Sequence, residues 1–471
     1  MSPSPEALQF RWRLLAALIA GLLWAASVPP LDGGLLPAVL LFPFLLLSLD
    51  GTTWKEGLLV GLFFACTALA IGCFWVYNVF GLIGFLLIPI VSLNQIVFAA
   101  GARLLLQQTK CNRFLEVAIW WTAIEFFRSE WAPLSNATMT IGGTVPTGFL
   151  MYPARYVGVY GLTFLAALLG CLIYRIYCYH RESKSVSKAF VFPLLLIVLW
   201  SAIGFLSAPK EESKKSFTAL AVQGERVPLD RFITNSEKGL RKVGKVDMVV
   251  WPEWALRGVF FEEEKKIQAK LAAFVKKHGV YLVFGNKRRA PGDFYNTVFV
   301  LSPQGEQLGY ASKSRPVPFL GDGTPTKNPA VVSTSLGKLG LPICYDADFS
   351  TVVLGHVARG AQCLIIPTCD NKHWGWFQHM QRARLLRLRG VETGRFILRV
   401  NTSGPSLIVA PDGTYREALW SGEEEHLLVK VELLNELTPY VQGGWIFGPI
   451  CLFISLLTVG AALRRIPAGN N

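Results

Sequence analysis

The fold of the polar half of this chain is decided by one stretch, residues 246–284, which reads VDMVVWPEWALRGVFFEEEKKIQAKLAAFVKKHGVYLVF. Residues 246–251 form an apolar, β-branched run that is typical of a buried strand. Residues 262–278 place apolar side chains on one face of a helix, and Gly279 follows as a natural C-cap. A second β-branched run covers 281–284. Strand, helix and strand in this order predict a βαβ unit, and with it an α/β domain.

The segment after this unit continues to alternate short strands with amphipathic helices. We expect hairpins over 297–312 and 331–343, helices near 349–359 and 378–392, strands at 363–366 and 396–400, and a last hairpin that turns at 411–413. Because hairpins stand between βα units, these elements predict two sheets covered by helices, an α-β-β-α sandwich.

Apolar residues are distributed unevenly along the 471 residues. Hydrophobic residues make up 52% of the chain and charged residues only 17%, a more apolar balance than that of an average soluble protein. Long apolar runs dominate 1–208 and 445–463, whereas 209–440 has mixed polarity. We therefore predict a transmembrane helical bundle of about seven spans in 1–208, an α/β domain in 209–440, and a last transmembrane helix with a short tail in 441–471.

Eight stretches are candidates for crossing the bilayer: 12–28, 35–49, 57–76, 80–105, 113–128, 158–179, 190–207 and 445–463. With eight spans, the basic clusters all fall on the side of the N-terminus: Arg11 with Arg13, Lys110 with Arg113, Arg175 with His180, Arg181, Lys184 and Lys188, and Arg464 with Arg465. The positive-inside rule makes that side cytoplasmic. It follows that 209–440 is expected to lie outside the cytoplasm.

The net charge of +14 does not indicate a nucleic-acid-binding protein, because the basic residues are scattered and no nucleic-acid motif accompanies them. Basic loops beside anionic lipid headgroups explain the excess. No pair of the nine cysteines has zinc-ligand spacing with histidines, and their positions do not suggest a disulfide framework. We expect neither a metal site nor a nucleic-acid partner.

Three chemically useful side chains follow three predicted strands. Glu253 ends Trp251-Pro252-Glu253, Lys313 follows a strand that ends at Ser312, and Cys344 follows Ile343. A partly desolvated glutamate serves as a base, a lysine stabilises an oxyanion, and a thiol with such neighbours becomes a nucleophile. Taken singly, each has a simpler interpretation: a surface acid, a solvated lysine, a buried packing thiol. Their shared position at strand ends favours the catalytic one.

These residues lie in longer motifs that resemble the apolipoprotein N-acyltransferases, membrane-bound members of the nitrilase superfamily. The motifs are Val222-Gln223-Gly224, Trp251-Pro252-Glu253, Lys313 with Val317-Pro318-Phe319, Ile343-Cys344-Tyr345, Gln378-His379-Met380, Val391-Glu392-Thr393-Gly394-Arg395 and Asn401-Thr402-Ser403-Gly404. The resemblance covers nearly the whole length and is strongest over 215–440. The helical half is similar in organisation more than in motif.

The resemblance implies a nitrilase-like catalytic domain and a cofactor-free, ping-pong acyl transfer at a bacterial inner membrane. Glu253 would be the base, Lys313 the oxyanion stabiliser, and Cys344 the nucleophile that takes an acyl chain from a phospholipid donor. The acceptor would be the α-amine of a diacylglyceryl-modified N-terminal cysteine on a lipoprotein. The catalytic domain would then be periplasmic.

Two acidic positions depart from the family pattern. Asp346 follows Cys344-Tyr345 where the family has glutamate, and Asp322 replaces a glutamate expected just after the Pro-Phe-Gly stretch. Each has lost a methylene, so we expect Asp322, Tyr345 and Asp346 to support the site with a changed reach.

Two further groups of side chains are candidates for contact with substrate. The aromatic residues Trp374, Trp376 and Phe377 suit a headgroup region that guides acyl chains, or alternatively pack within a loop. The arginines Arg382, Arg384, Arg387 and Arg389 suit lipid phosphate, but we favour a solvated helix face for them.

The sequence leaves two alternative functions open. A membrane-tethered amidase would resolve the same thioester with water in place of an amine. The shortened acids also allow a catalytically altered paralogue with a different acceptor, or a scaffold without activity.

Overall fold

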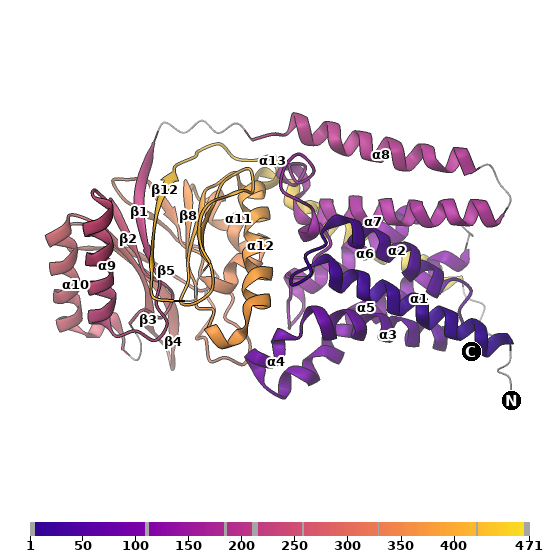
Figure 1. The fold of residues 1–471 in the computed structure, drawn as a ribbon, viewed down its shortest axis with the longest axis horizontal. Coiled ribbons are helices and arrows are strands. Elements are labelled where there is room, and N and C mark those ends of the chain that lie inside the picture. The colour runs from indigo at the N-terminus through magenta and orange to yellow at the C-terminus, as the bar shows by residue number, and fades with distance from the viewer. Residues whose placement is uncertain are drawn as a thin grey trace. The chain divides into compact units, whose positions relative to one another are not determined.

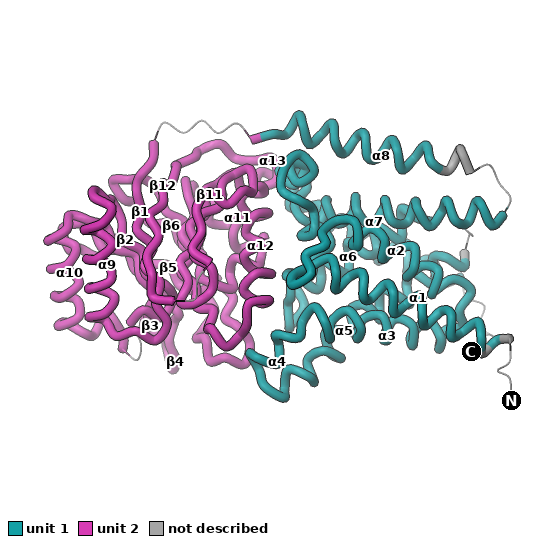
Figure 2. Tube along the Cα trace, viewed as in Figure 1, with its two compact units in different colours: residues 1–208, 444–471 teal, residues 209–443 magenta. Residues whose placement is uncertain are grey.

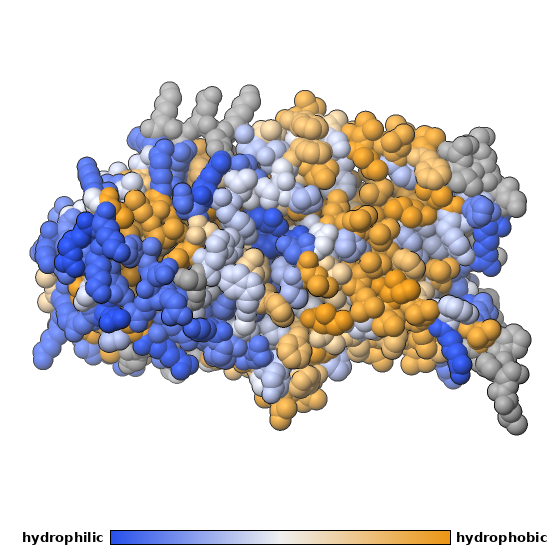
Figure 3. All heavy atoms as spheres, in the orientation of Figure 1, coloured by the Kyte–Doolittle hydropathy of each residue, from blue (hydrophilic) through white to orange (hydrophobic). Residues whose placement is uncertain are grey.

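The computed structural model describes residues 5–108, 113–182, 186–209, 215–256, 259–327, 329–420 and 423–465. Lys110 and Lys184, which the orientation argument used, lie outside these ranges. The chain divides into two compact units, Met1–Ala208 with Gly444–Asn471 and Pro209–Gly443 (Figure 2). Apolar residues cover most of the visible surface of the first unit, and hydrophilic residues cover most of that of the second (Figure 3).

The first unit consists of helices (Figure 1). They are α1 (Pro5–Ser27), α2 (Leu35–Leu49), α3 (Trp54–Gly72), α4 (Trp75–Phe80), α5 (Ile83–Gln108), α6 (Phe114–Phe126), α7 (Ala154–Arg181), α8 (Val186–Leu206) and α14 (Phe447–Arg464). A single π-helical turn, Phe127–Trp131, extends α6. Helix α1 packs on α2 and α3, and α14 packs on α6.

A helix lies over each of the eight predicted spans, but their lengths differ. Among the described residues, five helices are long and apolar enough to cross a membrane: Leu8–Ser27, Trp54–Gly72, Ile83–Gln107, Ala154–Arg181 and Gly444–Arg464. Two other apolar helices, Leu35–Leu49 and Phe114–Phe126, are shorter, with 15 and 13 residues, whereas α8 has 21 residues, of which Phe190–Leu206 are apolar. A helix of 15 residues, such as α2, is only about 22 Å long and does not reach across a hydrocarbon layer of about 30 Å. Five long apolar helices identify a membrane protein.

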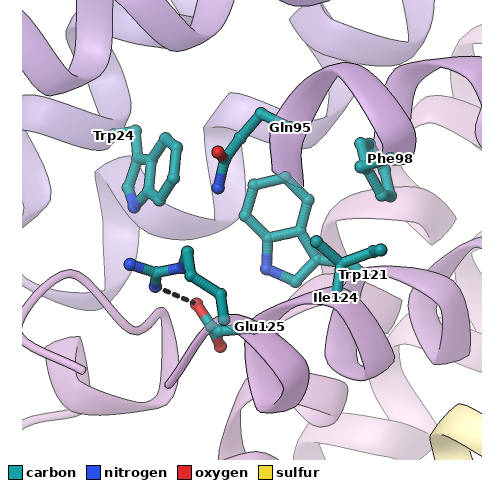
Figure 4. Close-up of a pocket in the computed structure, with 7 residues that line it drawn as sticks. Trp24, Gln95, Phe98, Trp121, Ile124 and Glu125 are labelled. Atoms are coloured by element: carbon teal, nitrogen blue, oxygen red, sulfur yellow. Dashed lines mark ion pairs between the residues drawn. The ribbon is translucent and has the colours of Figure 1, made fainter. Parts of the chain in front are cut away.

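One polar cluster is enclosed in the helical unit, beside a small cavity lined by Trp24, Gln95, Phe98, Trp121, Ile124, Glu125 and Arg128 (Figure 4). Glu125 of α6 pairs with Arg128 at 3.8 Å, and both side chains are buried. Glu125 also accepts hydrogen bonds from the backbone N–H of Ile141, at 2.7 Å, and from the hydroxyl of Thr163 in α7. Since ionisable groups inside a membrane bundle are tolerated when they are paired, this cluster fixes α6 to α7.

The second unit contains two six-stranded sheets. The first has the order β12-β1-β2-β3-β4-β5, and the second β11-β10-β9-β8-β7-β6. The strands are β1 (Ser216–Val222), β2 (Met248–Val250), β3 (Tyr281–Ala290), β4 (Asp293–Leu301), β5 (Gln307–Ser312), β6 (Val331–Ser333), β7 (Lys338–Gly340), β8 (Cys363–Pro367), β9 (Ile397–Val400), β10 (Ser406–Val409), β11 (Tyr415–Leu419) and β12 (His426–Glu432).

The two sheets face each other, and helices cover their outer faces (Figure 1). Helices α9 (Leu229–Val243) and α10 (Lys265–His278) cover the first sheet, and α11 (Ser350–Ala358) and α12 (Trp376–Thr393) cover the second. Side chains alternate between the two cores: Ala219 points between the sheets, whereas Leu220 points to the helices. The predicted α-β-β-α sandwich is confirmed.

Most predicted elements of this unit agree with the structure to within a few residues, but four were not predicted individually. These are β1, α9, β12 and the short helix α13 (Pro439–Gln442). Strand β1 pairs in parallel with β2 and antiparallel with β12, so that Val222 lies opposite His426. This pairing closes the sandwich with a strand from near the end of the unit.

Candidate active site

Glu253 lies three residues beyond β2, where the chain passes very close to β3. Its side chain is 1% exposed. A Cβ atom on Gly285 of β3 would lie 2.6 Å from Glu253 Cα and 2.9 Å from Trp254 N. The adjacent Trp254 has a φ of 60°, a backbone conformation that is uncommon for a residue with a side chain. The sequence therefore holds Glu253 in place by backbone packing against a glycine.

We expect Gly285→Ala to damage this site without touching a reactive group. Its methyl group would meet backbone atoms, which must shift, so the free energy of unfolding should fall by about 1–3 kcal/mol. A displacement of Glu253 by about 1 Å should lower turnover on the order of 100-fold. Thermal unfolding and acyl-transfer rates measure the two effects. Gly460→Ala in α14, where an added Cβ meets open space, is the matched control.

Lys313, directly after β5, joins two buried carboxylates. Its Nζ lies 2.9 Å from Glu253 Oε1 and 2.6 Å from Asp322 Oδ2. Asn296 Nδ2 donates to the same two groups, at 2.6 Å and 2.7 Å. Burial raises the pKa of Glu253 above its usual range, although Lys313 opposes this. Burial would lower the pKa of Lys313, but Glu253 and Asp322 outweigh it and raise that pKa, so the lysine is a permanent cation.

Cys344 opens a short 3-10 turn, Cys344–Asp348, that follows β7. Its φ is 49°, a left-handed backbone conformation that is strained for a non-glycine residue and that recurs at functional sites. The side chain is 3% exposed. Burial raises the pKa of its thiol to about 12; Arg382 and Lys313 lower this pKa, whereas Glu253 raises it. The structure thus brings the charges of Glu253 and Lys313 to act on the Cys344 sulfur.

A second charged cluster borders Cys344 on the side of α12. Arg382 Nη1 donates to Cys344 Sγ at 3.3 Å and to Asp370 Oδ1 at 2.7 Å, while its Nε donates to Asp348 Oδ1 at 3.2 Å. Asp370 also binds Arg399 of β9. Burial alone would raise the pKa of Asp370, but the two arginines outweigh it and hold this pKa well below its usual range.

The two shortened acids have different partners. Asp322 reaches Lys313 directly and also accepts from the backbone N–H of Val317 at 2.9 Å. Asp346 does not contact the ammonium group: it accepts from the backbone N–H groups of Ser314, Arg315 and Ile343. It therefore ties the segment after β5 to the segment before Cys344.

The remaining candidate residues lie at the edge of this site or away from it. Tyr345 packs edge-on against Phe349, with ring centroids 4.9 Å apart. Trp376 and Phe377 are 49% and 41% exposed, and Trp374 is partly buried. Their role in substrate binding stays a prediction.

The expected solvated face of arginines on α12 is wrong. Arg382, Arg384 and Arg389 are buried and Arg387 is partly buried. Arg389 donates to the backbone oxygens of Ala347 and Asp348, at 3.0 Å and 2.8 Å. The reason is that α12 packs on the sheet, on α11 and on the turn of Cys344, so nearly all of its faces are covered.

Four polar residues of the site were not found from the sequence: Asn296, Asp348, Asp370 and Arg399. One signal was available for Asp370, because it follows β8 as Glu253 follows β2. Asn296 lies inside β4 and no sequence pattern singled it out. The described residues contain no group of three or more histidine, cysteine or acidic side chains that could hold a metal ion.

Comparison with known proteins gives two family matches and many relatives. The family described as carbon-nitrogen hydrolase matches residues 229–434, and the apolipoprotein N-acyltransferase N-terminal domain matches residues 20–172. The relatives named apolipoprotein N-acyltransferase include proteins of Pseudomonas aeruginosa PAO1, 24% identical over 96% of both chains, Azotobacter vinelandii, 26% identical over 96% of this chain and 95% of that one, and Geobacter metallireducens, 24% identical over 73% of both.

Among solved structures, Saccharomyces cerevisiae Nit3, a member of branch 10 of the nitrilase superfamily, is 19% identical with a TM-score of 0.41, covering 48% of this chain and 93% of that one. One family match lies in each unit, and several relatives align over nearly their whole length. The chain is therefore similar to proteins named apolipoprotein N-acyltransferase over nearly its whole length, and its second unit matches the carbon-nitrogen hydrolase family.

Proposed function

We propose that this protein is a phospholipid-dependent N-acyltransferase that uses Cys344 as its nucleophile. An acyl chain moves from a phospholipid to Cys344 as a thioester, and then to the α-amine of the N-terminal diacylglyceryl cysteine of an apolipoprotein. The observation that carries the proposal is the buried ion pair of Glu253 and Lys313, whose charges shift the pKa of the buried Cys344 thiol, in a chain whose other unit carries long apolar helices.

We assign one task to each group. Glu253 takes the thiol proton, and the thiolate attacks the ester carbonyl of the phospholipid. Lys313 stabilises the oxyanion, and collapse of the intermediate breaks the C–O bond while Glu253 returns the proton to the departing alcohol. The acceptor amine then attacks the thioester, Glu253 takes the amine proton, and the C–S bond breaks. The thiolate is then reprotonated, which restores the starting state.

Both substrates carry hydrocarbon tails, so a membrane protein is the natural catalyst for them. We further propose that the protein resides in a bacterial inner membrane with residues 209–440 in the periplasm. In this orientation the basic loops lie in the cytoplasm, as the positive-inside rule requires. Protease protection of a tag placed after Arg465 tests this orientation, since a tag at that position must then be cytoplasmic.

A reconstituted assay tests the function itself. Purified protein in detergent is incubated with phospholipid and a diacylated lipopeptide, and products are separated by mass spectrometry. The proposal requires a triacylated peptide and an acyl adduct on the protein. Free fatty acid without acylated peptide would favour the hydrolytic alternative, and absence of both products would contradict acyl chemistry.

The raised pKa of Glu253 predicts the pH dependence. The base must be ionised to take the thiol proton, and burial moves its pKa above the ordinary glutamate value. Activity should therefore fall, as pH is lowered, at a pH above that at which an ordinary glutamate protonates. The profile of kcat/KM against pH measures this limb; a limb at or below the ordinary glutamate value would contradict the assignment of Glu253.

A further inference from the structure

Cys344 has a hydrogen-bond donor that lies outside the Glu253–Lys313 pair. Arg382 Nη1 is 3.3 Å from Cys344 Sγ, and the Arg382 side chain is buried. The guanidinium group cannot swing freely, because Asp348 and Asp370 hold it at 3.2 Å and 2.7 Å. A planar cation with several donors in a fixed fork suits such a shared position. Arg382 is therefore set against the sulfur by two carboxylates.

Four charged residues from four different elements of the fold act on the sulfur of Cys344. Glu253 follows β2, Lys313 follows β5, Asp370 follows β8, and Arg382 extends from α12. Lys313 is held between two carboxylates, Glu253 and Asp322, so much of its charge is already balanced. Arg382 also binds two carboxylates, Asp348 and Asp370, but it shares Asp370 with a second cation, Arg399, so less of its charge is balanced. After burial, Arg382 has the largest effect on the pKa of Cys344, which it lowers.

We propose that Arg382 is a further catalytic residue, which stabilises the thiolate of Cys344 both as the attacking nucleophile and as the leaving group. Its role in acyl transfer rests on the proposed function. The two cations then have separate tasks: Lys313 serves the oxyanion, and Arg382 serves the sulfur. No bond to Arg382 forms or breaks, and the thiol proton goes to Glu253.

Alkylation of Cys344 by a small reagent tests this role without lipid or peptide. The full-length protein in detergent is treated with iodoacetamide across a series of pH values, and modification of Cys344 is followed by peptide mass spectrometry. In Arg382→Gln, alkylation at neutral pH should be about tenfold slower, and the profile should move up by about one pH unit, because a tenfold change corresponds to one unit. A purely structural arginine would not shift this profile.

Loss of Arg382 alone leaves Asp348 buried without its cation, which endangers folding. The double variant Arg382→Gln with Asp348→Asn removes one positive and one negative charge, so the net charge of the buried cluster does not change. Arg382→Lys keeps a buried cation and so favours folding. One ammonium nitrogen cannot occupy both positions from which Arg382 Nε and Nη1 reach Asp348, Asp370 and Sγ, so its contact with Sγ should weaken and a smaller upward shift is expected. The control is Arg231→Met, whose side chain is 56% exposed on α9.

Thermal unfolding of each variant identifies those that fold. A folded variant without the Arg382 charge that alkylates at the rate and pH of the parent protein would overturn the proposal, and so would an unshifted Arg382→Lys variant. Failure of the parent protein to transfer acyl groups, with the alkylation shift intact, would instead contradict the proposed function and leave the role of Arg382 standing.

Discussion

Cys344→Ala is expected to abolish acyl transfer, with a loss of roughly 10⁴-fold or more, and to remove the acyl adduct from the protein. The reason is that the thioester is the obligatory intermediate of a ping-pong transfer, and no other group of the site can replace the sulfur. The protein should still fold, because the substitution deletes only one buried atom and retains the neutral character of the side chain.

Intact mass spectrometry after exposure to phospholipid measures this result. The parent protein should gain one acyl mass, and Cys344→Ala should gain none. Cys66→Ala, which changes a partly buried cysteine of α3, should retain the adduct and the activity. An acyl adduct that persists in Cys344→Ala, or transfer that continues without it, would remove the basis of the proposed mechanism.

The second large effect is expected for Lys313→Met, which should damage both stability and activity. Glu253 and Asp322 would remain buried without their shared cation, and removing one partner of a buried ion pair costs about 3–5 kcal/mol. Loss of an oxyanion donor should also lower turnover by about 10²–10³-fold. Chemical denaturation and acyl-transfer kinetics measure these two losses.

A compensated variant separates the two effects. Lys313→Met with Glu253→Gln and Asp322→Asn removes all three charges, so most of the lost stability should return while activity stays absent. Lys277→Met, which breaks an exposed ion pair with Glu237, should change stability by less than about 1 kcal/mol and leave activity intact. If Lys313→Met unfolded no more readily than Lys277→Met, the buried network would not have the energetic role assigned to it.

The short network distances also explain why the site accepts aspartate where the family pattern has glutamate. Asp322 follows a turn in which Phe319 has a φ of 66°, and this turn brings its carboxylate to 2.6 Å from Lys313 Nζ. Asp346 needs only to reach backbone N–H groups. Its Oδ1 accepts from Ser314 and Arg315 at 3.0 Å and 2.7 Å, and its Oδ2 accepts from Ile343 at 3.1 Å. The lost methylenes are offset by the path of the backbone, so both acids still hold the site together.

The amino-acid sequence by itself determined the fold class of this protein and the three positions at strand ends. Two signals in the sequence depend only on neighbouring residues. They are the length of an apolar run and the spacing of apolar residues, which differs between strands and helices. Because α/β folds build their sites at the carboxyl ends of strands, the positions of Glu253, Lys313 and Cys344 pointed to a common site before any distance was known. The sequence did not show that Glu253 and Lys313 follow strands of one sheet and Cys344 a strand of the other.

Only the tertiary structure decided what surrounds that site. The periodicity of α12 reports which side chains share a face, but not which other elements cover that face, and so the arginines looked solvated. Arg382 lies 38 residues from Cys344 and 34 from Asp348, and Asn296 lies 43 from Glu253. Such contacts arise when strands pair within a sheet and when α12 packs on the turn that holds Cys344. Burial and charge balance depend on this whole neighbourhood in space and not on spacing along the chain.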